Sequence, residues 1–209
     1  DGGTPITDAN VMNILLLGID TRNRDAVYSR SDSMILVSVN KNTKEIVLTS
    51  FMRDSYVYMR AADTYNRLNA ANVIGGPTYT CQVISEVFGV SVKQYALVNF
   101  FSFIDVVDAM GGVDIEVRED EISDLNDNLV HQNYVRGFDD EMDFVEHGPT
   151  RMMHLNGNQA LAYARIRYVG GDRERTERQR KVITLLMDKV RGLKLTELYD
   201  LLEVILPLV

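Results

Sequence analysis

The sequence predicts a single α/β domain in which a mixed central β-sheet is flanked by helices. Strand-like segments open the chain and then alternate with helical patterns, an order that is typical of this class. The chain has 209 residues, a length that fits one domain. Its composition, 45% hydrophobic and 25% charged, is that of a globular protein with enough apolar material for a core.

The first strands are predicted from apolar runs that end in polar turns. After a polar lead-in over residues 1–12, residues 13–20 form a continuous apolar run, which is typical of a buried strand. Residues 33–40 and 45–51 flank a polar turn and are predicted to form a hairpin. Residues 55–59 are expected to continue the same sheet.

The rest of the chain alternates helical patterns with short strands. Helices are predicted over 67–74, 78–88, 101–110, 158–163, 176–191 and 195–206, and strands over 95–100 and 113–117. Thr176 is the predicted N-cap of its helix, with Gln179 three residues later as in a capping box. Residues 118–150 are acidic with little periodicity, and they are predicted to form an irregular excursion within a domain that covers 13–209.

Charge and cysteine usage exclude some classes of function. A net charge of −8 argues against nucleic-acid binding, which requires a basic surface. The single cysteine, Cys81, excludes an intramolecular disulfide, and its apolar spacing with Ile84 and Phe88 predicts a buried thiol. The sequence shows neither a signal-peptide pattern nor the roughly 20 apolar residues that a membrane-spanning helix needs.

A basic run over residues 165–181 is the most informative feature of the chain. It contains six arginines and one lysine against three acidic residues, a local balance of +4 in an acidic protein. Arginine suits bidentate capture of phosphate oxygens, and a helix N-terminus adds unpaired N–H donors. The run therefore predicts a phosphate site; the alternative is a solvated helix entry of mixed charge.

Carboxylates and further arginines lie at the predicted ends of strands and helices. Asp20 and Asp32 would meet at one sheet edge if their strands are neighbours, and there they could share a magnesium ion with substrate phosphates. Arg30, Arg53 and Arg67 accompany them. Arginines around such carboxylates predict a di- or polyphosphate site. The alternatives are turn-forming or capping roles for the aspartates, and a salt bridge from Arg53 to Asp54 or another neighbouring acid.

Seven segments match one family in its order along the chain. They are L-L-L-G-I-D-T-R (15–22), R-S-D-S (30–33), L-T-S-F-M-R-D (48–54), N-R-L-N-A-A (66–71), F-I-D-V-V-D-A-M-G-G-V-D-I-E-V (103–117), L-N-G-N-Q-A-L-A-Y-A-R-I-R-Y (155–168) and D-R-E-R-T-E-R-Q-R (172–180). Each segment is weak alone, but seven in order are specific. The chain thus resembles the LytR-CpsA-Psr family of bacterial cell-wall enzymes.

The resemblance implies a phosphotransferase on the extracytoplasmic face of the bacterial membrane, normally tethered by an N-terminal helix that these residues lack. The family transfers a glycopolymer phosphate, such as wall teichoic acid or capsule, from a polyprenyl-pyrophosphate carrier to peptidoglycan. The implied cofactor is Mg²⁺, with Mn²⁺ as a substitute. The partners are therefore the prenyl lipid, the glycopolymer, the peptidoglycan acceptor and the membrane, and no nucleic acid.

The resemblance also implies roles for individual residues. Asp20 and Asp32 would hold the metal. The pyrophosphate would be bound by Arg30, Arg53, Arg67, Arg165, Arg167, Arg175, Arg178 and Gln179, with catalytic roles for Arg53, Arg165 and Arg167. Apart from the resemblance, a carboxylate near the acceptor could take its proton, and Asp172 is one candidate for this catalytic role. The prenyl chain would be lined by Val83, Val87, Phe88, Leu97, Phe100 and Phe103, residues that an ordinary core would explain equally well.

Two departures from the family and two rival functions accompany this reading. Arg67 stands where the family often has lysine, and residues 118–150 match no family segment. The same site could hydrolyse a polyprenyl pyrophosphate with water instead of a sugar hydroxyl. Alternatively, the protein could bind polyprenyl lipid as a non-catalytic scaffold of wall assembly.

Overall fold

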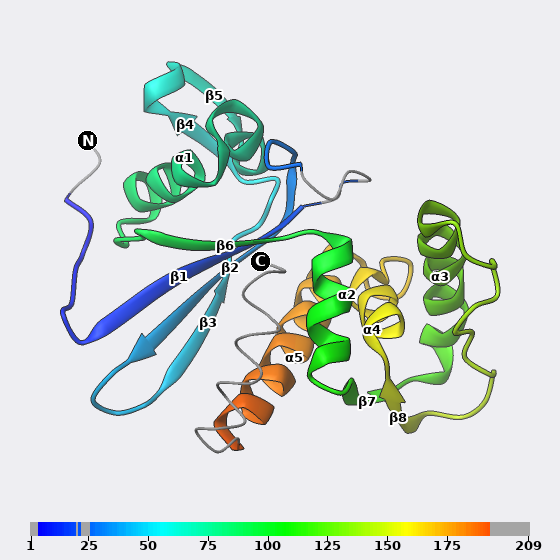
Figure 1. Ribbon diagram of the computed structural model, residues 1–209. Helices are drawn as coiled ribbons and strands as arrows, with labels where there is room; N and C mark the ends of the chain where they lie inside the picture. The colour runs from blue at the N-terminus through cyan, green and yellow to red at the C-terminus, as the bar shows by residue number, and fades with distance from the viewer. Residues whose placement is uncertain (1–3, 20, 22–25, 193–209) are drawn as a thin grey trace. The chain divides into compact units, whose positions relative to one another are not determined.

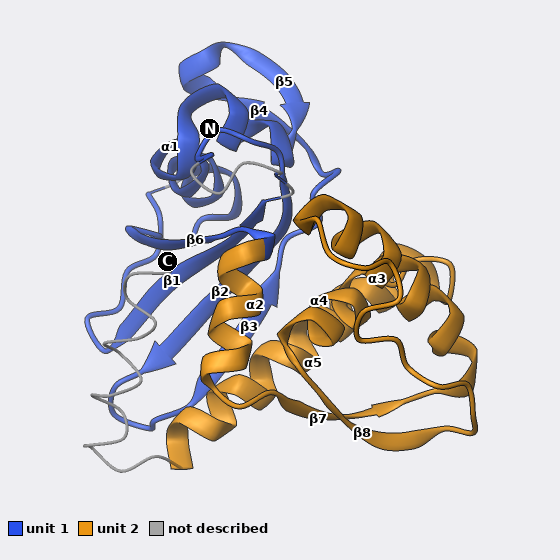
Figure 2. Ribbon diagram, turned by 45° about the vertical axis from the view of Figure 1, so that its right-hand side comes forward, with its two compact units in different colours: residues 1–100 blue, residues 101–209 orange. Residues whose placement is uncertain are grey.

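The computed structural model describes residues 4–19, 21 and 26–192. The chain forms two compact units, Asp1–Phe100 and Phe101–Val209, shown in blue and orange in Figure 2. Each unit has its own buried hydrophobic cluster. The α/β class with a mixed central sheet is confirmed, and that sheet lies in the first unit.

The sheet of the first unit contains four strands in the order β3-β2-β1-β6 (Figure 1). These are β1 (Val11–Ile19), β2 (Ser31–Asn40), β3 (Ile46–Ser50) and β6 (Gln94–Val98). β2 pairs antiparallel with both β1 and β3, so the predicted hairpin is confirmed, whereas β6 pairs parallel with β1. The first strand begins within the predicted lead-in, and Ile6 in that segment also forms a parallel bridge with Val90.

Residues 55–59 do not continue this sheet, contrary to the prediction. β4 (Tyr56–Met59) pairs instead with β5 (Thr64–Arg67) in a separate two-stranded sheet. The 3-10 helix η1 (Arg60–Ala62) joins the two strands, and Asp63 turns the chain with a left-handed backbone at φ 46°. Aspartate tolerates this conformation better than most residues, which makes so short a return possible.

The 3-10 helix η2 (Leu68–Ala70) leads into α1 (Ala71–Phe88), which contains a kink. Gly76 has φ 74° and Pro77 follows it, so the two helices predicted here meet at this break. The first of them does not begin at Arg67 as predicted, because Arg67 ends β5. The core between α1 and the strands consists of Leu15, Leu17, Met34, Leu36, Val57, Met59, Leu68, Ala71, Cys81, Val83, Ile84 and Val92. The buried Cys81 confirms that prediction, and desolvation raises the pKa of its thiol to about 11.

The second unit surrounds a short antiparallel pair with helices. The strands are β7 (Val113–Val117) and β8 (Arg151–Leu155), and the helices are α2 (Phe100–Ala109), η3 (Glu119–Glu121), α3 (Ile122–Arg136), α4 (Gly157–Arg165) and α5 (Gly171–Gly192). Between α2 and β7, Gly112 has φ 71°, and a Cβ there would lie 2.6 Å from the Leu155 carbonyl oxygen. Only glycine fits this turn.

Three predictions about the second unit need correction or fall outside the description. Residues 118–150 are not an irregular excursion throughout, because α3 occupies Ile122–Arg136 and Arg151 then opens a strand. Helix α5 begins at Gly171, so Thr176 is not its N-cap; the Thr176 hydroxyl donates instead to the Asp172 carbonyl oxygen inside the helix. The helix predicted over 195–206 lies outside the described residues.

Candidate functional site

Four charged side chains of the first unit form a continuous chain of ion pairs, which we call the ion-pair chain. Asp32 Oδ1 lies 2.6 Å from Arg53 Nη1, and Arg53 Nε lies 3.3 Å from Asp54 Oδ2. Arg67 Nη1 in turn lies 3.2 Å from Asp54 Oδ1. The fold therefore brings together three predicted site residues, Asp32, Arg53 and Arg67, and Asp54 links the two arginines.

Backbone hydrogen bonds hold the turn that carries the centre of this chain. Arg53 and Asp54 lie between β3 and β4, whereas Asp32 is in β2 and Arg67 ends β5. The Asn69 N–H donates to the Arg53 carbonyl at 3.0 Å, and the Leu68 N–H donates to the Ser55 carbonyl at 2.8 Å. Since Leu68 and Asn69 are buried, these bonds fix the turn to the core of the unit.

The ion-pair chain is accessible to solvent. The side chains of Asp32 and Arg53 are 31% and 21% exposed, and those of Asp54 and Arg67 are 45% and 55% exposed. The hydrogen bond from Arg67 lowers the pKa of Asp54, with a further contribution from the charge of Arg53. Guanidinium groups in such accessible pairs can exchange a carboxylate for a phosphate oxygen at little cost.

Asp32 has the chemistry of a magnesium ligand. Ile19 at the end of β1 pairs with Ser31, the residue before Asp32, whereas Asp20 lies outside the described residues. Hard carboxylate oxygens suit Mg²⁺, which needs only one or two of them beside phosphate oxygens and water. Within the part of the chain that the structure describes, no group of three or more His, Cys, Asp or Glu side chains could hold a metal by protein ligands alone. Of the two predicted ligands, Asp32 thus offers the carboxylate oxygen that a metal shared with a substrate phosphate needs.

In the second unit, a network of buried amides supports Arg165. The Arg165 Nη1 group donates to Gln132 Oε1 at 3.3 Å, and Gln132 Nε2 donates to both oxygens of Asn158 at 3.0 Å. Asn158 Nδ2 continues the network to Asn133 Oδ1 and Asp143 Oδ2. Gln132, Asn133 and Asn158 are all buried, so α3 and α4 are joined by satisfied polar contacts that orient the end of α4.

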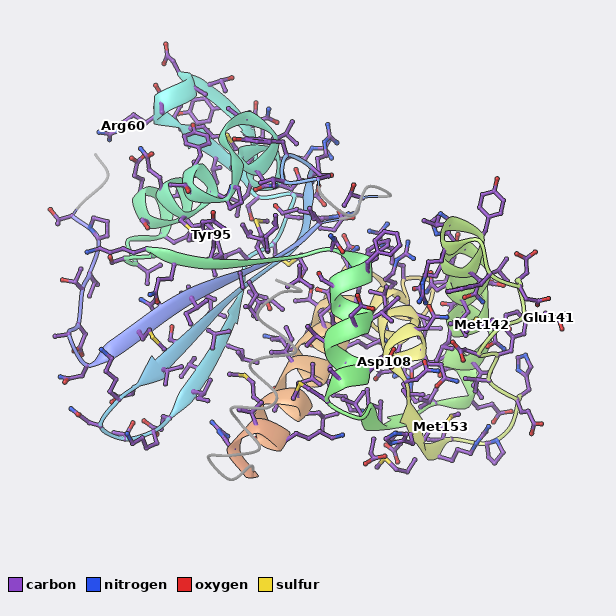
Figure 3. All side chains as sticks on the ribbon, in the orientation of Figure 1. Arg60, Tyr95, Asp108, Glu141, Met142 and Met153 are labelled. Atoms are coloured by element: carbon purple, nitrogen blue, oxygen red, sulfur yellow. The ribbon has the colours of Figure 1, made fainter. Side chains whose placement is uncertain are left out.

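A second set of contacts fixes the N-terminal end of α4. The Gly157 N–H donates to Asp108 Oδ1 at 2.6 Å, and Asp108 is labelled on α2 in Figure 3. Asn156 caps the helix, accepting from the Gln159 N–H while the Gln159 side chain accepts from the Asn156 N–H. Asp143 also accepts from Asn156 Nδ2 at 2.9 Å. Both ends of the helix that carries Arg165 are therefore fixed by hydrogen bonds.

Arg178 is buried in an ion pair, a placement that the sequence did not indicate. Its Nε group donates to Glu121 Oε1 at 2.7 Å, and both side chains are 4% exposed. Its other nitrogens donate to the Ile166 and Val169 carbonyls and to Glu174 Oε2. Arg178 thereby ties α5 to η3 and to the segment after α4, and its charge compensates that of Glu121.

The remaining residues predicted in the basic run differ in exposure. Arg175 is buried, with Nη2 3.3 Å from Asp172 Oδ1, and Asp172 is 38% exposed. Arg167 is exposed, and Gln179 is half-buried in the third turn of α5. Arg30, in the first unit, is also exposed. Because α5 begins at Gly171, Arg175, Arg178 and Gln179 lie inside the helix rather than at its start.

The residues predicted to line a prenyl slot occupy different surroundings. Val83 is in the core of the first unit, and Leu97 packs against that core. Val87 and Phe88 on α1 are exposed, and the Phe88 ring lies 4.7 Å from that of Phe51. Phe100 is half-buried, and Phe103 packs against the core of the second unit. The prenyl slot stays a prediction.

Sequence reasoning named Asp54 as an alternative partner of Arg53, but missed its pairing with Arg67 and missed Gln132 as a support. Asp54 directly follows Arg53, so a salt bridge between them was the stated alternative for Arg53, and both pairings occur. Gln132 gave no signal, because a glutamine in a polar segment is typical of a solvent-facing position.

As for membrane contact, none of the helices among residues 4–19, 21 and 26–192 combines the length and hydrophobicity needed to cross a bilayer.

Comparisons with known proteins identify the family. The LytR_cpsA_psr family matches residues 4–209. The chain is 32% identical over 191 residues to TagU of Enterococcus faecalis, named a polyisoprenyl-teichoic acid–peptidoglycan teichoic acid transferase, covering 90% of this chain and 56% of TagU. It is 30% identical over 203 residues to biofilm regulatory protein A of Streptococcus mutans, covering 92% of this chain and 47% of that protein. The chain thus spans about half the length of these curated relatives.

Solved structures give the same result. The chain resembles protein gbs0355 of Streptococcus agalactiae with a TM-score of 0.78 and 26% identity, over 95% of this chain and 67% of the other. It also resembles TagT with bound octaprenyl pyrophosphate lipid. The TM-score is 0.66 and the identity 27%, over 94% of this chain and 73% of TagT. On the sequence match and this fold, the chain belongs to the LytR-CpsA-Psr family.

Proposed function

We propose that this chain is the catalytic part of a phosphotransferase that moves a glycopolymer phosphate from a polyprenyl-pyrophosphate carrier onto peptidoglycan. The ion-pair chain is the observation that carries the proposal, because it presents two arginines and two carboxylates to solvent in one place. Its relatives support the same chemistry, since TagU is named a teichoic acid transferase and TagT binds octaprenyl pyrophosphate. The enzyme would work on the extracytoplasmic face of the bacterial membrane.

The ion-pair chain would bind the pyrophosphate of the carrier. Arg53 is held from one side by Asp32 and from the other by Asp54, so its planar fork is oriented before substrate arrives. Arg67 would add a second fork, which matches phosphate oxygens better than the lysine common at this position in the family. Arg30 would contribute further positive charge. Stabilisation of negative charge is the main need of phosphoryl transfer, and these residues provide it.

The reaction would exchange one phosphorus–oxygen bond for another. A sugar hydroxyl of the acceptor attacks the sugar-side phosphorus, the bridging bond of the pyrophosphate breaks, and polyprenyl phosphate leaves. The hydroxyl proton passes to a base, for which Asp172 is the candidate because its carboxylate is 38% exposed. Arg165 and Arg167 would also bind the pyrophosphate, and Gln132 would orient Arg165. Arg175, Arg178 and Gln179 would support this arrangement from inside α5.

A magnesium ion on Asp32 and Asp20 would complete the charge balance of the site. When bound, it would neutralise charge on the phosphate oxygens. The oxygen donor of Asp32 suits Mg²⁺, and Mn²⁺ would be an acceptable substitute. The prenyl chain would lie against Val83, Val87, Phe88, Leu97, Phe100 and Phe103.

The test is a transfer assay with a polyprenyl-pyrophosphate-linked glycopolymer and polymer-free peptidoglycan, with Mg²⁺ and with a chelator. We expect Arg53→Ala and Arg165→Ala to lower the turnover number by about 10²- to 10³-fold, the cost of removing one charge-stabilising group. Arg191→Ala is the control, since Arg191 forms a surface pair with Asp188 at 3.1 Å outside the predicted site residues. Unchanged turnover in both Arg53→Ala and Arg165→Ala would refute the site assignment.

The products separate this function from its two rivals. Polymer attached to peptidoglycan, with polyprenyl phosphate released, supports the transferase. Release without attachment identifies a polyprenyl-pyrophosphate phosphatase. Lipid binding without turnover, with or without Mg²⁺, identifies a non-catalytic scaffold.

A further inference from the structure

The hairpin of β4 and β5 carries three exposed tyrosines on one face, which we call the tyrosine face. Tyr58 and Tyr65 are directly opposite each other across the strands, and Tyr56 lies two residues before Tyr58. Side chains at these positions share one side of the sheet. Tyr56 is 72% exposed, Tyr58 40% and Tyr65 62%.

The opposite face of the hairpin explains why the rings point outward. Val57 and Met59 are 7% and 0% exposed and belong to the core of the first unit. The hairpin therefore already has its apolar face buried, and the tyrosines are not needed for the core. A contiguous exposed apolar patch of this kind marks an interaction site more often than a scattered set of residues does.

The three rings form a preorganised surface. The Tyr56 and Tyr65 rings are nearly parallel, with centroids 5.9 Å apart and an angle of 15° between planes. The Tyr58 ring lies 5.0 Å from that of Tyr65, and its hydroxyl donates to Asp63 Oδ1 at 2.6 Å. A partner would thus meet rings whose positions are already restricted, which lowers the entropic cost of binding.

The charges around the tyrosine face favour an uncharged partner. Arg60, labelled in Figure 3, lies in the turn between the strands with Asp63, and Arg67 lies opposite Tyr56 with its guanidinium on Asp54. The charges of Arg60 and Arg67 and those of Asp54 and Asp63 therefore sum to zero around the tyrosine face. A long anionic polymer or a membrane of anionic lipids binds through an excess of cations spread along a surface, whereas a single pyrophosphate needs only one or two guanidinium groups. Sugar rings instead present C–H groups that pack on the negative face of an aromatic ring, and hydroxyls that suit the polar rim.

We propose that the tyrosine face binds the sugar backbone of the peptidoglycan acceptor. This inference rests on the proposed function and adds a binding surface to it. Tyr56 pairs in register with Arg67, the last member of the ion-pair chain, so a glycan on the rings would lie next to the arginines that bind the pyrophosphate. The tyrosine face would thereby place an acceptor hydroxyl near the phosphate.

The test is co-sedimentation of the protein with three probes: polymer-free peptidoglycan stripped of its peptides, isolated anionic wall polymer, and vesicles of anionic phospholipid. We expect binding to the glycan and about tenfold weaker binding for Tyr56→Ala/Tyr65→Ala. Tyr134→Ala is the matched control, because Tyr134 is 73% exposed on α3 in the other unit. Tyr56→Phe/Tyr65→Phe should retain the binding, since the rings remain. A thermal melt would verify that all variants fold.

Each outcome bears on the inference separately from the transferase. Equal glycan binding by the wild type and the double alanine variant overturns it, and so does tyrosine-dependent binding to the wall polymer or the vesicles alone. Tyrosine-dependent glycan binding supports it. Because this readout requires no turnover, a protein that fails the transfer assay can still pass here, and the reverse also holds.

Discussion

The two units each contain an arginine–carboxylate pair of nearly equal length, but the pairs differ in burial. Arg53 and Asp32 are 2.6 Å apart and 21% and 31% exposed, whereas Arg178 and Glu121 are 2.7 Å apart and both 4% exposed. The first pair belongs to a chain of accessible charges. The second is enclosed by the Ile166 and Val169 carbonyls and Glu174.

This difference separates arginines that can bind a substrate from arginines that hold the fold. An exposed pair contributes at most about 1 kcal/mol to stability, so its partner can be exchanged for a phosphate. A buried pair cannot exchange partners without leaving a charge uncompensated in the interior. Family membership alone does not distinguish these arginines, because both lie in matching segments.

Breaking the buried pair should have the largest effect. Arg178→Met removes the 2.7 Å ion pair of the buried Glu121 and leaves its carboxylate with the Arg118 backbone N–H at 2.9 Å and the Arg118 guanidinium at 3.5 Å, so we expect the free energy of unfolding to fall by about 3 kcal/mol. Urea denaturation would measure the loss. The matched variant Arg53→Met should lose no more than about 1 kcal/mol. Equal losses in the two variants would show that burial does not separate these arginines.

A second substitution at the same pair sharpens the comparison. Replacing both partners, as Arg178→Met/Glu121→Leu, removes the uncompensated charge and should recover part of the stability that Arg178→Met loses. No recovery would mean that the lost stability comes from other bonds: those from Arg178 to the Ile166 and Val169 carbonyls, or that from the Arg118 N–H to Glu121, which the double variant also removes.

An intermediate effect is expected at the amide network. Gln132→Leu removes the acceptor of Arg165 and the donor to Asn158 in a buried position, and should cost about 1–3 kcal/mol of stability. The turnover number should also fall while the KM for the lipid changes less, because the substitution leaves Arg165 present but less well oriented. Asn128→Leu, which removes a half-buried bond to the Ala162 carbonyl on the same two helices, is the control for stability alone. Similar turnover in both variants would contradict an orienting role for Gln132.

The smallest effect concerns the pKa of Asp54 in the ion-pair chain. The folded pKa of Asp54 is lowered below its ordinary value of 3.8, chiefly by the hydrogen bond from Arg67. Its stabilising contribution is therefore complete above the unfolded pKa and is lost as the pH falls through the folded pKa. Arg67→Ala should raise the Asp54 pKa towards 3.8, measured by carboxyl NMR titration. Arg191→Ala should leave it unchanged, and an equal shift in both variants would show a general charge effect.

Much of the fold follows from local patterns in the sequence. The apolar run of β1 and the polar turn between β2 and β3 predict buried neighbours in a mixed sheet, and the structure confirms them. The sequence also places Asp32, Arg53 and Arg67 at the ends of elements, and in the structure Asp32 lies at the start of β2, Arg53 follows β3 and Arg67 ends β5. The pairing of Arg67 with Asp54 did not follow from the sequence, because Arg67 was predicted to open a helix. Alternation in β4 predicts a strand but not its partner, because alternation carries no information on register with a distant strand.

The errors have identifiable physical causes. Helix α3 was missed because part of its buried face consists of Gln132 and Asn133, whose polar side chains hide the helical period. The start of α5 was misplaced because Thr176 and Gln179 imitate a capping box inside a helix. Burial of Arg178 depends on Glu121, which is 57 residues away in the sequence, and no local pattern reports such a pairing.

The parallel pairing of β1 with β6 sets an order of events in folding. β1 can pair with β2 early, since the two are close in sequence, but its other edge must wait for a strand that begins at Gln94. Until then the segment from Ile14 to Leu17, whose side chains are all apolar, has an open edge of unpaired backbone N–H and C=O groups that another chain could join. Nascent chains that stop short of β6 would therefore be the species most prone to aggregation. Helix α1 is completed just before β6, and it would shield one face of the sheet but not the open edge of β1.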